Sequence, residues 1–533
     1  MSDSPNYIYL DGQKIETVDN NGDSTKLLCT ATPKRLRDNL GRLKVSVHQN
    51  IYEADFEYGA QPLRWESFTT GTGSITPLPG AGGVRMRISA VNDVTIRQSR
   101  PYHRYQPGKT MYMATAINLG AATTGQVQRV GFLDDSNGIF FEQANPTTVP
   151  GNPLGLFCVT RSDTSGSVVD TRVGFESWSD PDGVKKLLDW TKLQMVWIEY
   201  AWYGGGALRW GVFLNGEPFI LHETSSGNNL NVPWSRTGNL PVRYEQRNIT
   251  ATTQNDMIHY GVSVIVEGRV DEQRGFTYGY GQAAGVPQRS INANTTRFPL
   301  LTFRFRPMGT LEYGVDANYS GANGNLPAGG AAITGTPTTT SMTVAGTPWT
   351  VDQWKGRFVF FRGTGTSGLG QIARITGNTN NTLTYVDGVT GLPIATAPVA
   401  GAPYSIGLVN RGQLLPRLLS ISSNRSVTLE LITSTFSNPV TLTGASFNTL
   451  FSLGSSNSFA ERDVSATAIS TGGEVVYNSP CPSGALQTFD LSDFFALFNN
   501  IRGNAPDTLT VAITTDATSA LVGASVICQE AMS

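Results

Sequence analysis

The sequence is poor in charged residues and has no long apolar run. Charged residues make up only 15% of its 533 residues, and 39 lysines and arginines nearly balance 41 aspartates and glutamates. This balance excludes a global positive field, so we expect no nucleic-acid partner. No apolar run approaches the roughly 20 residues that span a bilayer, and Met1–Asp11 lacks a signal-peptide pattern. We therefore expect that the protein is made in a cytoplasm and does not insert into a membrane.

Cysteine and histidine are also scarce, and neither shows the spacing of a metal site. The four cysteines contain no C-x-x-C pair; they are Cys29, Cys158, Cys481 and Cys528. We expect isolated core thiols rather than a disulfide framework or a zinc ribbon. The four histidines show no H-x-x-x-H spacing; they are His48, His103, His222 and His259. No serine lies in G-x-S-x-G either, so the sequence predicts no metal and no cofactor.

Turn-forming residues, in contrast, are abundant. The chain has 58 glycines and 28 prolines, with many threonines, serines and asparagines. This composition favours many short strands joined by tight turns over helices. Hydrophobic residues make up 39% of the chain, which allows each of about three to four domains to bury its own core. The composition therefore predicts a multidomain all-β protein.

Alternating side chains predict individual strands in the first half of the chain. In Val84–Ile88 the apolar residues fall on one face and two arginines on the other, as in a half-buried antiparallel strand. Turn signals such as Asp135–Gly138 separate further segments of this kind. They are Thr110–Ile117, Val127–Leu133, Gly138–Glu142 and Leu156–Arg161. Short strands at this spacing predict a β-sandwich.

The stretch from Val173 to Glu223 predicts the centre of that sandwich. After a short helical segment at Val184–Asp189, Met195–Trp202 is apolar on both faces except for Glu199, as in a strand covered on each side. The next strand, Leu208–Leu214, turns at Asn215-Gly216 into Pro218–Leu221, because this pair supplies the positive φ angles of a two-residue hairpin. Four tryptophans add a large apolar surface to one core: Trp190, Trp197, Trp202 and Trp210.

Composition shifts along the chain suggest the domain boundaries. A Gly, Ala, Thr and Pro-rich stretch precedes a compact unit of short strands, which interrupts the surrounding pattern and reads as an insertion. A last β-rich part includes one short helix at Leu491–Phe498. The predicted units are a docking arm (1–58), a lectin-like β-sandwich (59–314), a linker (315–340), an inserted small β-module (341–407) and a C-terminal β-domain that packs with the sandwich (408–533). The predicted central fold is a jelly-roll or concanavalin-like sandwich.

Several motifs match binding sites literally, but their context favours a structural explanation. Gly363–Gly368 reads G-x-G-x-x-G, yet Gln371–Ile375 continues as a strand, so no helix N-terminus is present to hold a pyrophosphate. Asp19, Asn21 and Asp23 have the spacing of calcium ligands, but the loop lacks the sixth-position glycine and the closing glutamate. Both motifs are interpreted as turns.

Two charged clusters are interpreted in the same way. Asp134, Asp135 and Asn137 offer oxygen ligands for a hard cation, but aspartate and asparagine also occur in turns for backbone reasons alone. Lys34, Arg35 and Arg37 form a basic patch that is either a docking arm or a solvated turn. The turn is favoured, because no aromatic residues interleave with the basic ones.

The sequence offers limited material for glycan chemistry. Concanavalin-type sandwich hydrolases commonly place their carboxylates on one strand as E-x-D-x-x-E, whereas the equivalent strand here offers only Glu199. This residue either pairs with Arg209 or borders a groove. The candidate glycan contacts are Trp202, Tyr203 and Trp210. Aromatic residues at such strand positions are more often core residues, and this alternative stays open.

A set of segments carries a family resemblance. They are Val94–Lys109, Gly131–Glu142, Trp210–Val212, His222-Glu223, Asn228–Leu230 and Asn239–Glu245. Together they resemble a family of tailed-bacteriophage virion structural proteins, over roughly Leu36–Glu312 and again beyond Gly407. The resemblance implies a concanavalin-like (laminin-G-like) sandwich at the tail, baseplate or capsid surface. The unit from Ser341 to Gly407 is similar to a small β-module of phage appendage proteins.

These observations lead to a main expectation and two alternatives. We expect a non-enzymatic structural component of a virion, made in the host bacterial cytoplasm, which acts through assembly with other virion proteins. We also expect a homo-oligomer, as a trimer, because phage fibre parts commonly assemble that way. The first alternative is a receptor- or carbohydrate-binding module that contacts a host surface glycan. The second alternative is a glycan depolymerase.

Overall fold

The computed structural model describes most of the chain between residues 6 and 531. The segments that it leaves out are 11–12, 21–22, 30–36, 39, 41, 43, 45–47, 145–153, 204–205, 270–274, 283–287, 317–329, 363–369, 435–437, 450–457, 485 and 493–495. For the strands between residues 6 and 29 and for residues 448–449, the description covers the backbone alone. Lys34, Arg35, the G-x-G-x-x-G motif and the side chains of the calcium-like loop therefore lie outside the described residues.

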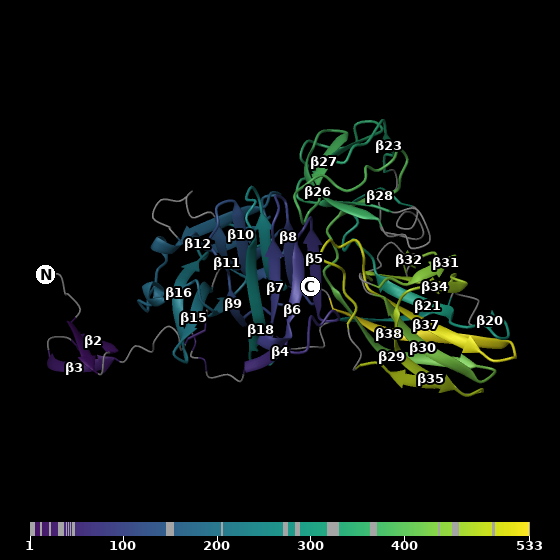
Figure 1. Ribbon diagram of the computed structural model, residues 1–533, viewed down its shortest axis with the longest axis horizontal. Helices are drawn as coiled ribbons and strands as arrows, with labels where there is room; N and C mark the ends of the chain where they lie inside the picture. The colour runs from purple at the N-terminus through teal and green to yellow at the C-terminus, as the bar shows by residue number, and fades with distance from the viewer. Residues whose placement is uncertain are drawn as a thin grey trace.

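The protein is all-β and multidomain, as the composition predicts (Figure 1). Its described residues form no α-helix; they include three short 3₁₀ helices, η2 (Pro79–Ala81), η3 (Phe175–Ser177) and η4 (Lys185–Leu187). The helical segment predicted at Val184–Asp189 is thus a single 3₁₀ turn. The residues described within Leu491–Phe498 are not helical. No helix in the described part is long and apolar enough to cross a membrane.

Two antiparallel sheets pack face to face as the first sandwich. One sheet, called the β13–β5 sheet, has the order β13 (Val169–Gly174), β12 (Leu156–Ser162), β11 (Gly138–Ala144), β10 (Gln126–Leu133), β17 (Val242–Asn248), β8 (Val94–Ser99) and β5 (Trp65–Thr70). The other, called the β16–β6 sheet, has the order β16 (Glu217–Ser225), β15 (Ala207–Leu214), β14 (Gln194–Tyr200), β9 (Met111–Asn118), β18 (Asn255–Glu267), β7 (Gly83–Ile88) and β6 (Ser74–Leu78), and β4 (His48–Ala54) also pairs with β18.

The strands of this sandwich follow the predicted alternation closely. Strand β7 contains the predicted Val84–Ile88, with Val84, Met86 and Ile88 fully buried and the arginines between them half-buried. The hairpin between β15 and β16 turns at Asn215 and Gly216, whose φ angles of 53° and 84° are both positive. These are the angles that the Asn-Gly pair predicts.

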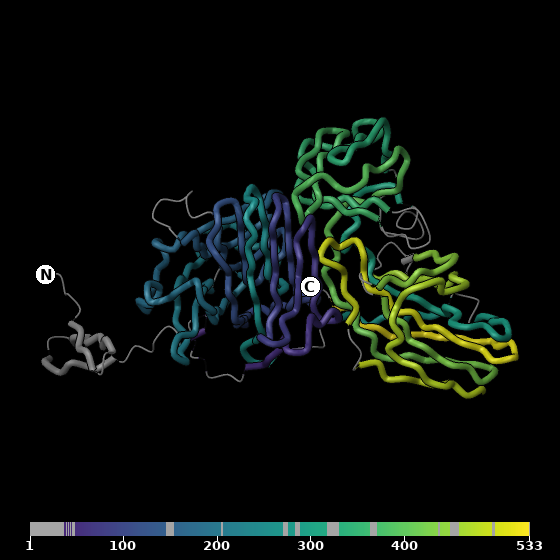
Figure 2. Tube along the Cα trace, viewed as in Figure 1, coloured from purple at the N-terminus to yellow at the C-terminus, as the bar shows by residue number. Residues whose placement is uncertain are grey.

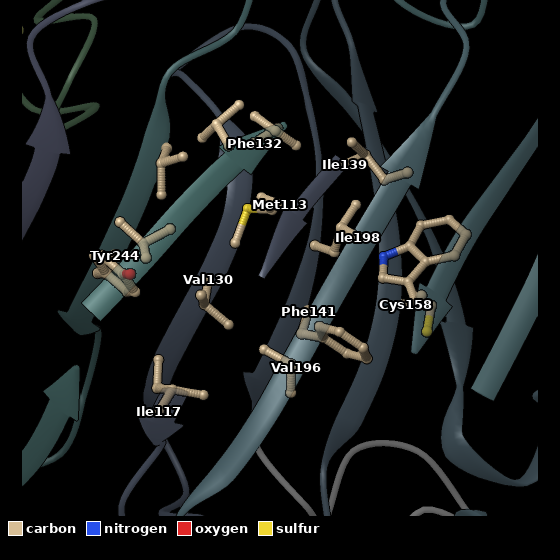
Figure 3. Packing of buried hydrophobic residues seen from close by; sticks show 14 of the residues in the cluster. Met113, Ile117, Val130, Phe132, Ile139, Phe141, Cys158, Val196, Ile198 and Tyr244 are labelled. Carbon is tan, nitrogen blue, oxygen red and sulfur yellow. The ribbon is translucent and has the colours of Figure 1, made fainter. Parts of the chain in front are cut away.

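The core of the first sandwich lies between the inner faces of the two sheets. Val196 and Ile198 of β14 pack there against residues of the opposite sheet such as Val130 and Phe141 (Figure 3). All four side chains have 0% exposure. Each buried side chain of this size contributes roughly 1.5–3 kcal/mol relative to an exposed one, which makes this cluster the main source of the sandwich's stability.

A second sandwich combines the C-terminal part of the chain with Phe276–Phe305, a segment that the sequence predicts to belong to the first sandwich. One sheet has the order β19 (Phe276–Gly281), β38 (Ala520–Ala531), β29 (Gln413–Ser423) and β36 (Gln487–Asp490), with β20 (Arg289–Ile291) on β38. The other has the order β32 (Asn448–Thr449), β33 (Ala460–Asp463), β21 (Phe298–Phe305), β37 (Thr508–Thr515), β30 (Val427–Ser434) and β35 (Glu474–Cys481). A separate two-stranded sheet joins β31 (Thr441–Thr443) to β34 (Ala468–Thr471).

The domain boundaries therefore differ from those predicted. Phe276–Phe305 pairs with β37 and β38 of the second sandwich and not with the strands before it. In the same way, β4 belongs to the first sandwich although it lies within the predicted arm. Alternation reveals where a strand is but not which distant strand it pairs with, so the sequence could not fix these boundaries.

The predicted inserted module is a separate seven-stranded sheet. Its order is β22 (Tyr313–Val315), β28 (Tyr404–Gly407), β25 (Phe358–Phe361), β26 (Gln371–Asn378), β27 (Thr382–Val386), β24 (Ser341–Val344) and β23 (Ile333–Thr334). It interrupts the second sandwich between β21 and β29, and Figure 2 shows it as a body of its own beside the two sandwiches. At the N-terminus, β1 (Asn6–Leu10), β2 (Gln13–Asn20) and β3 (Asp23–Cys29) form a small antiparallel sheet.

The described cysteines are buried free thiols, in agreement with the predicted core positions. Cys158 lies in the first core, and Cys481 and Cys528 lie in the second. Burial raises the pKa of the Cys158 thiol well above its ordinary value, so this thiol is unreactive at neutral pH.

Replacing Ile198 in the first core tests the contribution of this packing. Ile198→Ala leaves a cavity between the sheets and should lower the free energy of unfolding by about 2–5 kcal/mol. Urea denaturation followed by tryptophan fluorescence measures this loss. The matched control is Val399→Ala, whose side chain is 66% exposed on the module and whose replacement should stay within about 0.5 kcal/mol. Equal stabilities of the two variants would contradict the proposed core.

Candidate functional site

The outer face of the β16–β6 sheet carries a row of polar and aromatic side chains. Because side chains alternate along a strand, Glu199 of β14 faces away from the core that Ile198 enters. Strand pairing places Glu199 opposite Tyr112 of β9 on one side and Arg209 of β15 on the other. Arg209 in turn lies opposite Glu223 of β16. These four residues form one row across the strands, in the order Glu223, Arg209, Glu199 and Tyr112.

A pocket of about 330 Å³ lies over this row, called here the outer-face pocket. Its lining residues are Lys44, His48, Thr110, Tyr112, Trp197, Glu199, Arg209, Phe213, Pro218, Ile220, Ile265 and Glu267. Its volume and its mixture of aromatic, aliphatic and a few charged side chains are typical of small-molecule sites.

An aromatic surface forms part of the pocket wall. The rings of Trp197 and Tyr112 are stacked, with centroids 5.7 Å apart and an interplanar angle of 23°. The Trp197 indole lies over β15, where its Nε1 donates a hydrogen bond to the Val212 carbonyl at 3.3 Å. A Cβ atom at Gly211 would lie only 2.0 Å from this indole, so the position needs glycine. The Trp197 indole itself is only 3% exposed, so the half-buried Tyr112 ring presents the accessible part of this aromatic wall beside Glu199.

The Glu199 carboxylate is the most enclosed charged group of the pocket. Its side chain is 1% exposed, and it lies 3.3 Å from the Lys44 ammonium and 3.4 Å from Arg209 Nη1. Burial raises the pKa of this carboxyl above its ordinary value, although the charges of Lys44 and Arg209 act in the opposite direction. Burial of a carboxyl beside aromatic rings shifts its pKa in the direction that general-acid catalysis requires.

Arg209 is held in place by further partners. Its Nε donates to Glu223 at 2.8 Å, and its Nη1 donates to the Arg37 carbonyl at 2.8 Å. Lys44 contacts the Tyr112 ring as well, with its Nζ 5.7 Å from the ring centroid. These contacts fix both cations against the aromatic surface.

A second carboxylate, Glu267, borders the same pocket from β18. It lies two residues beyond Ile265, which pairs with Tyr112, so it projects from the same face of the sheet. Strands β14 and β18 both flank β9, and a spacing of about 4.8 Å between neighbouring strands places them roughly 10 Å apart. The Glu267 carboxyl also interacts with Asp38, whose pKa lies below its ordinary value although burial acts in the opposite direction. The two acids thus come from different strands and do not form an E-x-D-x-x-E motif.

The sequence predictions for this region were partly confirmed. Glu199 both pairs with Arg209 and borders a pocket, so the two alternatives weighed for it hold together. Trp197 was interpreted only as a core residue, because Met195–Trp202 is apolar at nearly every position. Tyr112, Lys44 and Glu267 were missed, since no local motif connects strands that are far apart in sequence. A polar residue in an otherwise apolar central strand was the one available signal.

The candidate glycan contacts Trp202, Tyr203 and Trp210 do not lie together. Trp210 is 1% exposed in the first core, where its Nε1 donates to the Phe140 carbonyl at 3.0 Å. This burial gives no glycan access to Trp210, so the core alternative applies there. Trp202 and Tyr203 follow β14, with their rings stacked at 4.7 Å, and Tyr203 is 48% exposed. Trp202 borders a different cavity from Glu199.

Asp134 stabilises a turn through backbone hydrogen bonds, which agrees with the turn predicted for Asp134, Asp135 and Asn137. Asp134 Oδ1 accepts hydrogen bonds from the backbone N–H groups of Ser136 and Asn137, each at 2.8 Å. Asp135 forms an ion pair with Arg243 at 2.6 Å. Among the described residues, no group of three or more histidines, cysteines and acids is arranged to hold a metal ion.

Comparison with known proteins finds similar folds but no family. No family model matches the chain, and no curated protein matches its sequence. Among solved structures, the chain is similar to the Crh5 transglycosylase in complex with NAG, at 12% identity over 44% of this chain and 91% of that one, with a TM-score of 0.28. It is also similar to a β-1,3-glucanase from Mycobacterium marinum, at 11% identity over 40% and 98%, with a TM-score of 0.29.

A third similar structure is Rv0315 of Mycobacterium tuberculosis, described as an immunostimulatory antigen and pseudo β-1,3-glucanase. It shares 10% identity over 42% of this chain and 99% of that one, with a TM-score of 0.29. At such identities and scores, no residue role is transferred from these proteins to this chain.

These comparisons contradict the expected function. The prediction of a virion structural component without enzymatic activity is wrong by this comparison, because the similar structures include a transglycosylase and a β-1,3-glucanase by name. The sequence reasoning took the missing E-x-D-x-x-E motif as evidence against chemistry. Two acids on separate strands, as found here, leave no such motif in the sequence.

The raised pKa of Glu199 predicts a specific pH dependence of stability. A carboxyl whose pKa is higher in the folded state than its ordinary 4.5 contributes stability that is fully present below that value and is lost as the pH rises through the folded pKa. Glu199→Gln keeps a neutral side chain at every pH. The free energy of unfolding of Glu199→Gln relative to the unmodified protein should therefore increase between pH 4 and pH 8.

Urea denaturation at several pH values measures this difference, by about 1.4 kcal/mol for each unit of pKa shift. Glu176→Gln, at an exposed position of the same sandwich, serves as the control. A relative stability of Glu199→Gln that is constant or decreases with pH would show that Lys44 and Arg209 dominate over burial.

Proposed function

We propose that this protein binds a glycan in the outer-face pocket and cleaves it there. The observation that carries the proposal is the enclosed Glu199 carboxyl, with its raised pKa, beside the stacked rings of Trp197 and Tyr112.

The pocket offers both kinds of contact that a sugar ring needs. A sugar ring has an apolar face of C–H groups, which can lie on the Tyr112 ring, and Trp197 holds that ring from behind by stacking. Its hydroxyl groups can accept hydrogen bonds from Lys44 and Arg209 and donate them to Glu267. A few polar groups placed around an apolar surface provide orientation and specificity in such sites.

The two carboxyl groups supply the chemistry of glycosidic cleavage. Glu199 donates its proton to the oxygen that leaves as the bond between the anomeric carbon and that oxygen breaks. Glu267 takes a proton from a water molecule, whose oxygen forms the new bond to the anomeric carbon. The separation of their strands by β9 leaves room for this water between the two acids, as an inverting mechanism requires.

A second candidate function is glycan binding without cleavage. The ion pairs of Glu199 with Lys44 and Arg209 favour it, because two cations stabilise the ionised carboxylate and oppose proton donation. In that case the same pocket recognises sugar through its aromatic surface, and Glu199 only positions the two cations.

Glycan binding and release of reducing ends can be measured separately on the full chain. We expect the protein to release new reducing ends from a β-1,3-glucan or from the capsule or lipopolysaccharide of a bacterial host. Glu199→Gln should lower this rate about 10²–10⁴-fold, because it removes the donated proton, while calorimetric affinity changes only a few-fold. Trp197→Ala should weaken the affinity about tenfold, because it removes the ring on which Tyr112 stacks.

Tyr58→Ala is the matched control, because this ring is 89% exposed and does not line the pocket. Binding that depends on Trp197 without any new reducing ends supports the second candidate. The absence of both binding and cleavage for all of these glycans contradicts the proposal.

The family resemblance and the predicted location stay predictions beside this function. If the chain is part of a tailed-phage particle, a host surface glycan is the natural substrate class, and partner virion proteins would hold the pocket against the cell. Mass spectrometry of purified particles checks the location, and analytical ultracentrifugation checks the expected trimer.

A further inference from the structure

The segment Phe498–Asp507, called here the docking segment, contacts all three bodies. It contains no strand and lies between β36 and β37 of the second sandwich. On the side of the first sandwich, Glu66 of β5 accepts a hydrogen bond from the backbone N–H of Ile501 at 2.9 Å. On the side of the module, Asn504 Nδ2 donates to the Gly370 carbonyl at 2.8 Å. One short loop therefore connects the second sandwich to the other two bodies.

Asn500 fixes the conformation of the docking segment. Its Oδ1 accepts hydrogen bonds from the backbone N–H groups of Gly503, Asn504 and Ala505, at 2.7, 2.9 and 3.1 Å. An asparagine side chain that pairs with nearby backbone groups stabilises a tight turn. The loop thus meets the first sandwich as a preformed unit.

An apolar contact surrounds the point at which the docking segment meets the β13–β5 sheet. Ile501 is 0% exposed and shares an apolar cluster with two residues of β8 and with Val389 of the module, and Phe68 of β5 packs against this cluster. Glu66 projects from the same face of β5 as Phe68, because the two residues are separated by two positions. The Glu66 carboxyl therefore lies beside an apolar contact, and the residue is only 9% exposed.

A buried ion pair lies in the same interface. Arg100, which follows β8, pairs with Asp507 at the end of the docking segment, and both side chains are 5% exposed. Asp507 also accepts a hydrogen bond from the backbone N–H of Phe498 at 3.0 Å. Arg100 thus donates directly to Asp507, whereas it acts on Glu66 only through its charge.

The other cations on the side of the second sandwich have partners of their own. Arg411, which precedes β29, lies 5.2 Å from the centroid of the Tyr102 ring. Arg502 of the docking segment forms an ion pair with Asp387 of the module at 3.3 Å. In the part of the chain that the structure describes, neither arginine forms an ion pair with Glu66.

On the sheet itself, the neighbour of Glu66 is neutral. Gln98 of β8 lies directly opposite Glu66, and its Oε1 accepts a hydrogen bond from Arg243 Nε at 2.8 Å. Arg243 in turn pairs with Asp135 at 2.6 Å and with Glu245 at 3.2 Å. Glu66 is therefore a buried carboxyl whose only direct hydrogen bond, among the described residues, comes from the backbone of the docking segment.

This environment disfavours the ionised form of Glu66. Burial, together with the charge of Asp507, raises the pKa of its carboxyl from 4.5 to about 7, although Arg100 and the hydrogen bond from Ile501 act in the opposite direction. When the interface separates, water surrounds Glu66 and its pKa returns to the ordinary value. Protonation therefore favours the closed interface. This contribution is fully present below pH 4.5 and is lost as the pH rises through about 7.

We propose that the contact between the two sandwiches is a pH-sensitive joint, which is closed by a proton on Glu66 and loosens when this carboxyl ionises. An ionised Glu66 places a charge without a close cation beside the apolar contact of Ile501, which is unfavourable. Loosening releases the docking segment from β5 and β8, so the second sandwich gains freedom relative to the first. The joint goes beyond the proposed glycan function and does not depend on it.

Hydrogen–deuterium exchange of the full chain, followed by mass spectrometry between pH 5 and pH 8, tests the joint. Each exchange rate is divided by the intrinsic rate at that pH, which gives a protection factor. Peptides that contain Ile501 should lose protection about ten- to a hundredfold over this range, because the closed interface binds the Glu66 proton more tightly than the open one.

Glu66→Gln keeps a neutral side chain, with an oxygen acceptor for the Ile501 N–H, at every pH. The protection of these peptides in Glu66→Gln relative to the unmodified protein should therefore rise about ten- to a hundredfold from pH 5 to pH 8. This ratio separates Glu66 from Asp507, whose pKa is also raised by burial. Glu57→Gln, at an exposed position between β4 and β5, is the matched control and should behave as the unmodified protein does.

Peptides of β30, in the core of the second sandwich, provide an internal control and should protect equally in Glu66→Gln and in the unmodified protein. A ratio around Ile501 that is constant or falls with pH overturns the proposal. An equal change in β30 also overturns it, because the effect then belongs to global unfolding. If Glu66→Gln does not fold, the protection around Ile501 relative to β30 in the unmodified protein still decides.

Discussion

The alternation of side chains along β14 is the constraint on which the rest of the structure depends. Val196 and Ile198 enter the core of the first sandwich, so Trp197 and Glu199 must face outward. A shift of one residue would bury the carboxylate between the sheets and expose the core. The apolar packing that stabilises the sandwich therefore also determines the position of the acid in the outer-face pocket.

The central strands of the β13–β5 sheet are unusual because their outward faces too are buried. On the β13–β5 sheet, Arg129 bridges Glu142 and Glu245 at 2.8 and 2.6 Å, and Arg243 has 0% exposure. Removing charges from water is unfavourable unless they are paired, so every such face needs matched acids and bases. Glu199, held by Lys44 and Arg209, is one member of this pattern, and it differs from the others in bordering a pocket beside stacked aromatic rings.

The arrangement of the three bodies also explains why two separate cavities are present. The outer-face pocket belongs to one sheet of the first sandwich, where neighbouring strands fix its residues in register. A second cavity, of about 400 Å³, is lined by residues of all three bodies and exists only because the second sandwich and the module dock beside the first. A small apolar cluster of Val94, Ile96, Val389 and Ile501 takes one or two residues from each body and supports that docking. The outer-face pocket and the contacts between the bodies thus lie in different parts of one chain.

The sequence by itself determined the all-β class, most strands of the first sandwich and of the module, and the Asn215-Gly216 hairpin, because alternation and turn chemistry are local properties. It also singled out Glu199 as a polar residue in an apolar strand. Only the tertiary structure decided that Phe276–Phe305 joins the second sandwich, that Trp210 is a core residue, and that Glu267 and Tyr112 share a pocket with Glu199. Those facts depend on which distant strands pair. Pairing is decided by packing between segments far apart in the chain, and no local sequence motif records it.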